Sequence, residues 1–188
     1  MRKYSGLFIV LGIMLVVIII FAGYYNSFMS LEETVEGRWA EIENNLQRRA
    51  DLIPNLVASV QGYVSHEAAV FTEIAQARSR LLGAEGVAGK VEASSALDSA
   101  LGRLLMVVEQ YPELKADRRF AELQDELAGT ENRIAVARMD YNNSVREFNA
   151  AVRRFPTVIA ARLFGFSSRD YFEADEGAGK VPEVDFSN

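Results

Sequence analysis

The stretch FMSLEETVEGRWAEIENNLQRRADLIPNLVASV, residues 28–60, decides the fold. Its apolar side chains recur at alternating steps of three and four residues, a spacing that is typical of a helix packed against a partner helix. The alternation of a β-strand does not occur at useful length anywhere in the chain. The pattern therefore predicts an all-α fold built from long helices. The predicted seam consists of Phe28, Leu31, Val35, Trp39, Ile42, Leu46, Ile53, Leu56 and Val60.

Pro54 lies inside this stretch. It has no backbone N–H to donate to the carbonyl of Ala50, and its ring crowds that turn. The apolar spacing stays in phase across Pro54, so we predict a kinked helix that continues rather than ends there. Gly62 and Ser65 mark a better break, because glycine weakens a helix and serine can cap the next one.

The run GLFIVLGIMLVVIIIFAGYY, residues 6–25, precedes the seam and contains no charged residue. Twenty helical residues rise about 30 Å, the thickness of the hydrocarbon core of a bilayer. Tyr24 and Tyr25 stand where interfacial aromatic residues are expected. We therefore predict that residues 1–25 form a single-pass membrane anchor, and that lipid is its partner.

A cleaved signal peptide is the alternative for this segment. The apolar run is longer than the roughly 7–15 residues of a signal-peptide core, and no Ala-x-Ala pattern follows it. These features favour an uncleaved signal-anchor. Arg2 and Lys3 precede the run, whereas Glu32, Glu33 and Glu36 follow it before any basic residue. The positive-inside rule then predicts a cytoplasmic N-terminus, with the bundle outside.

Further helices are expected after Gly62. Apolar spacing and breakers predict a second helix from His66 to about Leu82, a flexible glycine-rich connection at Gly83–Lys90, a third helix that ends at Tyr111, and a long fourth helix from Phe120 to Phe155. At about 1.5 Å per residue, the first and fourth helices are long and the middle two short. These lengths close as an antiparallel up-down four-helix bundle over residues 26–155.

Residues 156–188 are expected to form a short apolar helix and an acidic extended tail. Val158, Ile159, Leu163 and Phe164 supply the apolar character, and Gly165 is the expected stop. This segment either covers the base of the bundle or meets lipid, and covering is the simpler interpretation.

Catalytic patterns are missing from the sequence. The chain has one histidine, His66, and no cysteine, so metal sites, catalytic triads and thiol nucleophiles lack their ligands or bases. The glycines at 83, 86 and 89 lack the strand-then-helix context of a phosphate-binding loop. We therefore expect a protein that is not an enzyme, without cofactor or metal. A net charge of −6 argues against nucleic-acid binding.

Two polar clusters lie beside the predicted seams and could face each other in an up-down bundle. One structural interpretation is a buried network that fixes helix register, in which arginines pair with carboxylates and an asparagine satisfies the carbonyl freed by Pro54. The functional alternative is a docking surface for a protein partner, with Trp39 or Tyr63 as an aromatic anchor. The clusters are Arg48, Arg49, Asp51 and Asn55, and Glu131, Asn132, Arg133, Arg138, Tyr141, Asn142 and Asn149.

Several of these residues belong to motifs that resemble the LemA family. The matching segments include RRADLIPNLV at 48–57, EQYPELKA at 109–116, TENRI at 130–134 and FGF at 164–166, and they cover nearly the whole chain beyond the anchor. The resemblance implies an N-terminal anchor, an antiparallel helical bundle and no assigned catalytic residue. It also implies a bacterial envelope setting, with a membrane protease among the plausible partners. Family members are often described as having a cytoplasmic soluble part, which opposes the charge-based orientation.

Two functions from different classes fit these features. The first is a membrane-anchored scaffold or adaptor of the bacterial cytoplasmic membrane that binds other envelope proteins and can self-associate. The second is a signalling or sensing subunit that relays envelope stress through its helices. The kink at Pro54 and the soft segment Ala128-Gly129-Thr130 motivate the second function.

Overall fold

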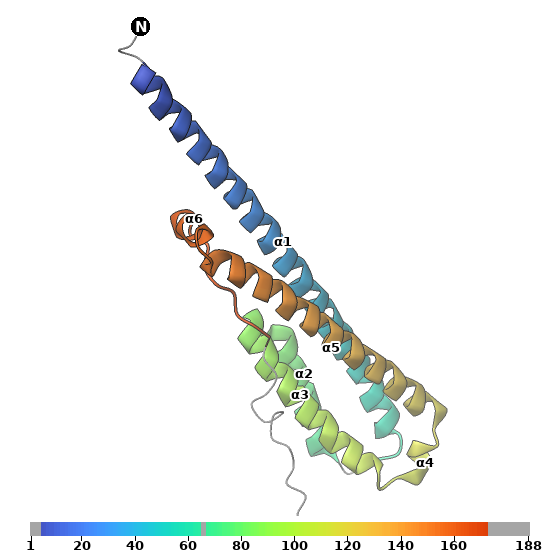
Figure 1. The fold of residues 1–188 in the computed structure, drawn as a ribbon. Helices are drawn as coiled ribbons and strands as arrows, with labels where there is room; N and C mark the ends of the chain where they lie inside the picture. The colour runs from blue at the N-terminus through green and yellow to red at the C-terminus, as the bar shows by residue number, and fades with distance from the viewer. Residues whose placement is uncertain (1–4, 65–66, 173–188) are drawn as a thin grey trace, which may run out of the picture. The chain divides into compact units, whose positions relative to one another are not determined.

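The computed structural model describes residues 5–64 and 67–172, and within these residues every regular element is a helix (Figure 1). The predicted all-α fold is therefore confirmed. The helices are α1 (Ser5–Gln61), α2 (Ala68–Gly83), α3 (Gly86–Val108), α4 (Pro112–Lys115), α5 (Arg118–Arg153) and α6 (Thr157–Phe164).

Helix α1 runs without a break through Pro54, as the in-phase spacing predicted. Its first part contains a stretch with a mean hydropathy of 3.0, and the side chains of residues 7–20 are all exposed. Among the described residues, α1 is the one helix that is long and apolar enough to cross a membrane.

Helix boundaries differ from the prediction at several places. Helix α3 ends at Val108 rather than Tyr111, and the short helix α4 was not predicted. The flexible connection expected at Gly83–Lys90 is wrong, because only Ala84 and Glu85 separate α2 from α3. Gly86 makes this tight link with a φ of +67°, a conformation that glycine adopts without strain. The Lys90 ammonium donates to the carbonyl of Leu81 at 3.0 Å, which satisfies the end of α2.

A further difference is at the C-terminal end of α5, which stops at Arg153. Phe155, expected on the inward face of this helix, lies beyond its end and is 76% exposed. Gly165 ends α6 with a φ of +81°, so the predicted stop is confirmed. Ser65, His66 and the acidic tail from residue 173 onward lie outside the described residues.

The chain divides into two compact units. Unit 1 comprises residues 1–40 and 139–170, and unit 2 comprises residues 41–138 and 171–188. Helices α1 and α5 each contribute to both units, whereas α6 belongs to unit 1 and α2, α3 and α4 belong to unit 2.

In unit 1, α1 and α5 run antiparallel. Trp39 lies against Tyr141 with ring centroids 5.5 Å apart, and Arg38 lies 3.9 Å from Asp140. Nearer the start of α1, Phe28 lies against Phe166, as does Phe148 from nearer the end of α5. The buried side chains of this unit include Phe28, Val35, Tyr141, Val145, Phe148, Val152, Ala160 and Ala161.

In unit 2, α1 and α5 are also antiparallel. Arg49 of α1 pairs with Glu131 of α5, whereas Tyr63, beyond the end of α1, bonds to Asp117, just before α5 begins. Helices α2 and α3 form an antiparallel hairpin, in which Arg103 pairs with Glu73. Burying each large apolar side chain contributes about 1.5–3 kcal/mol. The core residues include Ile42, Leu46, Ile53, Leu56, Val60, Ile74, Leu81, Leu97, Leu104, Leu114, Phe120 and Ile134.

Candidate functional site: a buried arginine beside an acidic groove

Arg49 occupies a seam position of α1. It lies three residues after Leu46 and four before Ile53, so helical geometry directs its side chain toward the core of unit 2. Only 4% of this side chain is exposed. A buried guanidinium costs several kcal/mol of desolvation unless charged and polar groups surround it. The neighbours of Arg49 therefore decide whether the position is tolerated.

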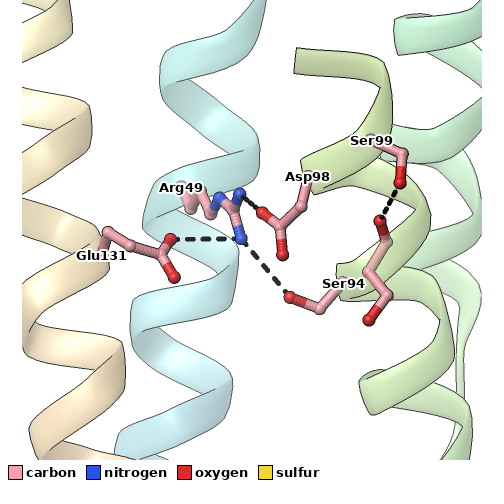
Figure 2. Close-up of polar contacts among 6 residues, drawn as sticks. Arg49, Ser94, Asp98, Ser99 and Glu131 are labelled. Carbon is pink, nitrogen blue, oxygen red and sulfur yellow. Dashed lines mark hydrogen bonds and ion pairs between the residues drawn. The ribbon is translucent and has the colours of Figure 1, made fainter. Parts of the chain in front are cut away.

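Three side chains from two other helices meet this guanidinium (Figure 2). Asp98 of α3 forms an ion pair with Nη2, and Ser94, one turn earlier, accepts a hydrogen bond from Nη1 at 3.4 Å. Glu131 of α5 lies 3.3 Å from Nη1 on the opposite side. The buried Nε has no hydrogen-bond partner among the described residues. Arg49 thus joins α1, α3 and α5 through one charged centre.

The two carboxylates remain partly in water, because the side chains of Asp98 and Glu131 are 52% and 47% exposed. This asymmetry places a buried cation beside anions at the surface. A buried ion pair of this kind contributes little net stability, because the desolvation of the charges offsets most of their attraction. By contrast, Arg48 pairs with Glu126 at 3.1 Å on the exposed surface, where such pairs contribute at most about 1 kcal/mol.

A groove in unit 2 opens beside Arg49 and has a volume of about 560 Å³. Four leucines and an alanine supply apolar contact area, whereas three carboxylates accompany the single guanidinium. The lining residues are Arg49, Leu56, Asp98, Leu101, Gly102, Leu105, Gln124, Asp125, Leu127, Ala128 and Glu131. The groove therefore combines apolar contact area with an excess of carboxylates.

The carbonyl that Pro54 leaves without a donor is satisfied by an arginine. Nε of Arg78, on α2, donates to the carbonyl oxygen of Ala50 at 2.7 Å, and the same guanidinium lies 3.8 Å from Asp51. The expectation that an asparagine performs this role is wrong. Asn55 is exposed on α1, where its side chain makes no such contact within the described residues.

The second predicted polar cluster is divided. Glu131 faces Arg49, but Tyr141 and Asn149 lie in unit 1 and hold the extended segment after α6. The Asn149 amide donates to the carbonyl of Arg169 at 2.9 Å and accepts from its N–H at 2.8 Å. The Tyr141 hydroxyl donates to the carbonyl of Asp170 at 2.9 Å, and burial raises the pKa of this phenol. These two side chains therefore hold a backbone strap, residues 169 and 170, and do not join the arginine network.

The remaining members of the cluster lie at separate places on α5. Arg138 stacks its guanidinium 4.4 Å from the ring centre of Phe172, a cation–π contact. Arg133 donates to the hydroxyl of Thr130 at 3.1 Å, and Thr130 itself is fully buried at a seam position. Asn132 is exposed and Asn142 is half-buried.

Both aromatic residues considered as partner anchors make contacts inside their own units. Trp39 is half-buried against Tyr141. The Tyr63 hydroxyl donates to Asp117 at 2.9 Å, and this hydrogen bond raises the pKa of Tyr63. Asp117 also accepts from the N–H groups of Arg119 and Phe120, which caps the first turn of α5. The Phe120 N–H and the Tyr63 hydroxyl lower the pKa of Asp117.

Sequence reasoning missed Ser94, Asp98 and Arg78. Asp98 directly follows the seam residue Leu97, and Ser94 precedes Asp98 by one turn, so both lie at the edge of an apolar face. Arg49 itself carried a usable signal, because an arginine at a seam position requires an acidic partner on a facing helix. No three acidic or histidine side chains come together as a metal-binding group in the part of the chain that the structure describes.

Comparison with known proteins gives a consistent result. The chain is 28% identical to magnetosome protein MamQ of Magnetospirillum gryphiswaldense, over 85% of this chain and 68% of that protein. It shows the same identity and coverage with magnetosome protein MamQ 2 of Paramagnetospirillum magneticum. It is 27% identical to protein LemA of Metamycoplasma hominis, over 84% of this chain and 72% of that protein. The profile of the LemA family matches residues 38–186, which include the Arg49 cluster and the groove, and the chain therefore belongs to the LemA family.

Proposed function

We propose that this LemA family protein is a membrane-anchored adaptor, without enzymatic activity, whose groove in unit 2 binds a helical segment of another envelope protein. The observation that carries the proposal is the groove beside Arg49, which combines four leucines with an excess of carboxylates. The exposed apolar part of α1 supports anchoring in the bacterial cytoplasmic membrane. By the positive-inside rule, unit 2 lies outside the cytoplasm.

The chemistry of the groove favours one occupant, an amphipathic helix with leucine-like side chains flanked by lysine or arginine. Apolar anchors in a groove between helices are a common way to bind a partner helix. Asp98 and Glu131 form ion pairs with Arg49, whereas Asp125 lines the groove and is exposed. A basic residue of the partner beside Asp125 would set orientation and on-rate more than affinity. The family resemblance makes a membrane protease one partner to examine.

A photo-crosslinking amino acid at Leu105 tests this proposal in native membranes. Leu105 lines the groove and is 43% exposed, whereas its neighbour Met106 is 63% exposed and is not among the lining residues. The proposal predicts a discrete adduct from Leu105 that Met106 does not give, attached to a basic, apolar helix of another protein. Equal labelling from both positions would contradict it. An adduct with a second copy of the chain would contradict the adaptor function and indicate a self-associating scaffold instead.

One observation favours the alternative of a signalling subunit. Helix α1 is a continuous helix of 57 residues that carries both the apolar stretch and two groove residues, Arg49 and Leu56. Spin labels at Leu105 and Ala128, on two walls of the groove, distinguish the functions. A label separation that changes when the bilayer is thinned supports relay through α1. A constant separation supports the adaptor.

A further inference from the structure

Helix α6 lies against the apolar part of α1 within unit 1. The ring of Phe164 is 6.3 Å from that of Phe21 and 5.2 Å from that of Tyr25. Phe166, just after α6, is 5.9 Å from Tyr25 and 5.1 Å from Phe28. The α1 residues in contact therefore belong to the last part of the apolar run 6–25 and to the turn that follows it.

An open apolar groove of about 630 Å³ lies beside this contact between the two helices. Val17, Ile18, Phe21, Ala22, Tyr25 and Asn26 line it from α1, and Leu163 and Phe164 line it from α6. Except for Asn26 and the Tyr25 hydroxyl, these side chains carry no polar group. Contact between this surface and water is therefore unfavourable. Acyl chains fill such a surface without that cost.

The exposed face of α6, which shares Leu163 with the groove, is apolar as well. Ala160 and Ala161 are buried, whereas Ile159 is 53% exposed and Leu163 is 69% exposed. Ile159 and Leu163 are four residues apart and share one helix face. Phe155, just before α6, adds a third large exposed apolar side chain. Exposed apolar side chains at this density on a short helix mark a surface that another phase or molecule covers.

Charge favours an anionic surface as the partner of this face. The chain has a net charge of −6, but no acidic residue occurs between Glu147 and Asp170. Arg153, Arg154 and Arg162 are exposed in this segment. Arg162 lies on α6 itself, whereas Arg153 and Arg154 precede it in the chain. An apolar helix flanked by basic residues is typical of the interface of an anionic membrane.

We propose that α6 is a second membrane-binding element, lying in the interface of the same leaflet that α1 leaves, with Ile159 and Leu163 among the acyl chains and Arg153, Arg154 and Arg162 at phosphate headgroups. The inference rests on the proposed anchoring by α1, because the position of α1 in the membrane determines the depth of α6. Contact with Phe21 and Tyr25 places α6 at the end of the span rather than at its middle. Unit 1 is then held at the membrane surface at two points.

The absence of cysteine from the chain permits a clean test by site-directed spin labelling. Single cysteines replace Leu163, Ile13 or Met106 in the full-length protein, which is reconstituted into vesicles of phosphatidylcholine and phosphatidylglycerol. Ile13 lies within the apolar run, and Met106 is an exposed residue of unit 2. Collision rates with oxygen, which concentrates in lipid, and with a water-soluble nickel complex are measured at each label.

The proposal predicts that L163C follows I13C, with frequent oxygen and rare nickel collisions, whereas M106C shows the reverse ratio. If L163C follows M106C while I13C remains in lipid, the inference about α6 is wrong and the anchor stands. If L163C is shielded from both reagents, protein rather than lipid covers this face, and the inference is again wrong. If I13C is itself accessible to nickel, the proposed anchoring fails.

Discussion

At the scale of single residues, Arg49 shows how one polar side chain at a seam position organises its surroundings. The apolar residues on either side of it predict burial, and burial requires acidic partners on facing helices. Those partners, Asp98 and Glu131, come from α3 and α5. Which acids would meet Arg49 depends on how the helices pack, and helix periodicity does not contain that information.

Replacement of Arg49 by methionine is predicted to change the free energy of unfolding by less than about 1 kcal/mol, because an apolar side chain removes the desolvation cost together with the ion pair. The double variant Asp98→Asn with Glu131→Gln is predicted to lose about 3 kcal/mol, because it leaves the guanidinium buried without a countercharge. Urea unfolding of the full chain in detergent micelles, followed by circular dichroism, measures both. A larger loss for R49M than for the double variant would contradict this assignment.

Asp117 gives a prediction for pH dependence. Hydrogen bonds from Phe120 N–H and Tyr63 hold its pKa below that of the unfolded chain. A group with a lowered folded pKa stabilises the fold above its unfolded pKa, and the stabilisation is lost as pH falls through the folded pKa. The loss is therefore expected at acid pH, below about pH 4.

Asp117→Asn is the matched control, because asparagine also caps a helix but does not titrate. The melting temperature of the native protein should fall more steeply than that of D117N as pH decreases from 5 toward 2. Parallel curves for the two proteins would show that Asp117 contributes nothing to the pH dependence.

At the scale of helices, the sequence predicts what depends on local spacing. The seams of α1, α3 and α5, the passage through Pro54 and the stop at Gly165 follow from periodicity and backbone chemistry. The glycines at 83, 86 and 89 predict a flexible connection, but Gly86 makes a tight link and Gly89 is helical. Packing of α2 on α3 overrides the weak helix propensity of glycine there.

The strap held by Tyr141 and Asn149 could not be predicted in this way. Both side chains bind backbone groups of Arg169 and Asp170, which lie after α6 in the chain. Backbone atoms are the same at every residue, so no sequence pattern identifies them as partners. Tyr141 and Asn149 belong to a polar cluster predicted beside the seam, but this position does not show which atoms they contact.

Arg78 and Pro54 are predicted to be coupled. Arg78→Ala leaves the carbonyl of Ala50 buried without a donor, which costs about 1–3 kcal/mol. Pro54→Ala returns the N–H of residue 54 to that carbonyl. In the P54A background, R78A should therefore cost clearly less than in the native chain. A double-mutant cycle of unfolding free energies measures the difference, and additive effects of the two substitutions would refute the coupling.

At the scale of the whole molecule, the apolar run of α1 and the groove of unit 2 belong to separate compact units joined by continuous helices. This division suits the proposed adaptor, in which membrane attachment and partner binding are assigned to different units. The apolar run was evident from hydropathy alone. The groove is not evident from the sequence, because its lining residues come from three separate helices, α1, α3 and α5.

The side of the membrane that carries unit 2 is predicted from charge. A single cysteine at Leu82, an exposed residue of α2, should react with a membrane-impermeant maleimide in intact cells, because the positive-inside rule places unit 2 outside the cytoplasm. Lysed cells provide the control for reactivity. Labelling only after lysis would reverse this orientation and move the search for partners to the cytoplasm.

A charge exchange across the groove tests the central claim, partner binding in unit 2, most directly. Asp125→Lys is predicted to lower the yield of the Leu105 crosslink roughly tenfold, because like charges oppose each other in the complex. Asp125→Asn should have a smaller effect. Replacement of the crosslinked partner's lysine or arginine by glutamate should restore the yield with D125K. An unchanged yield with D125K, or no restoration by the partner's exchange, would contradict the proposed adaptor function of this groove.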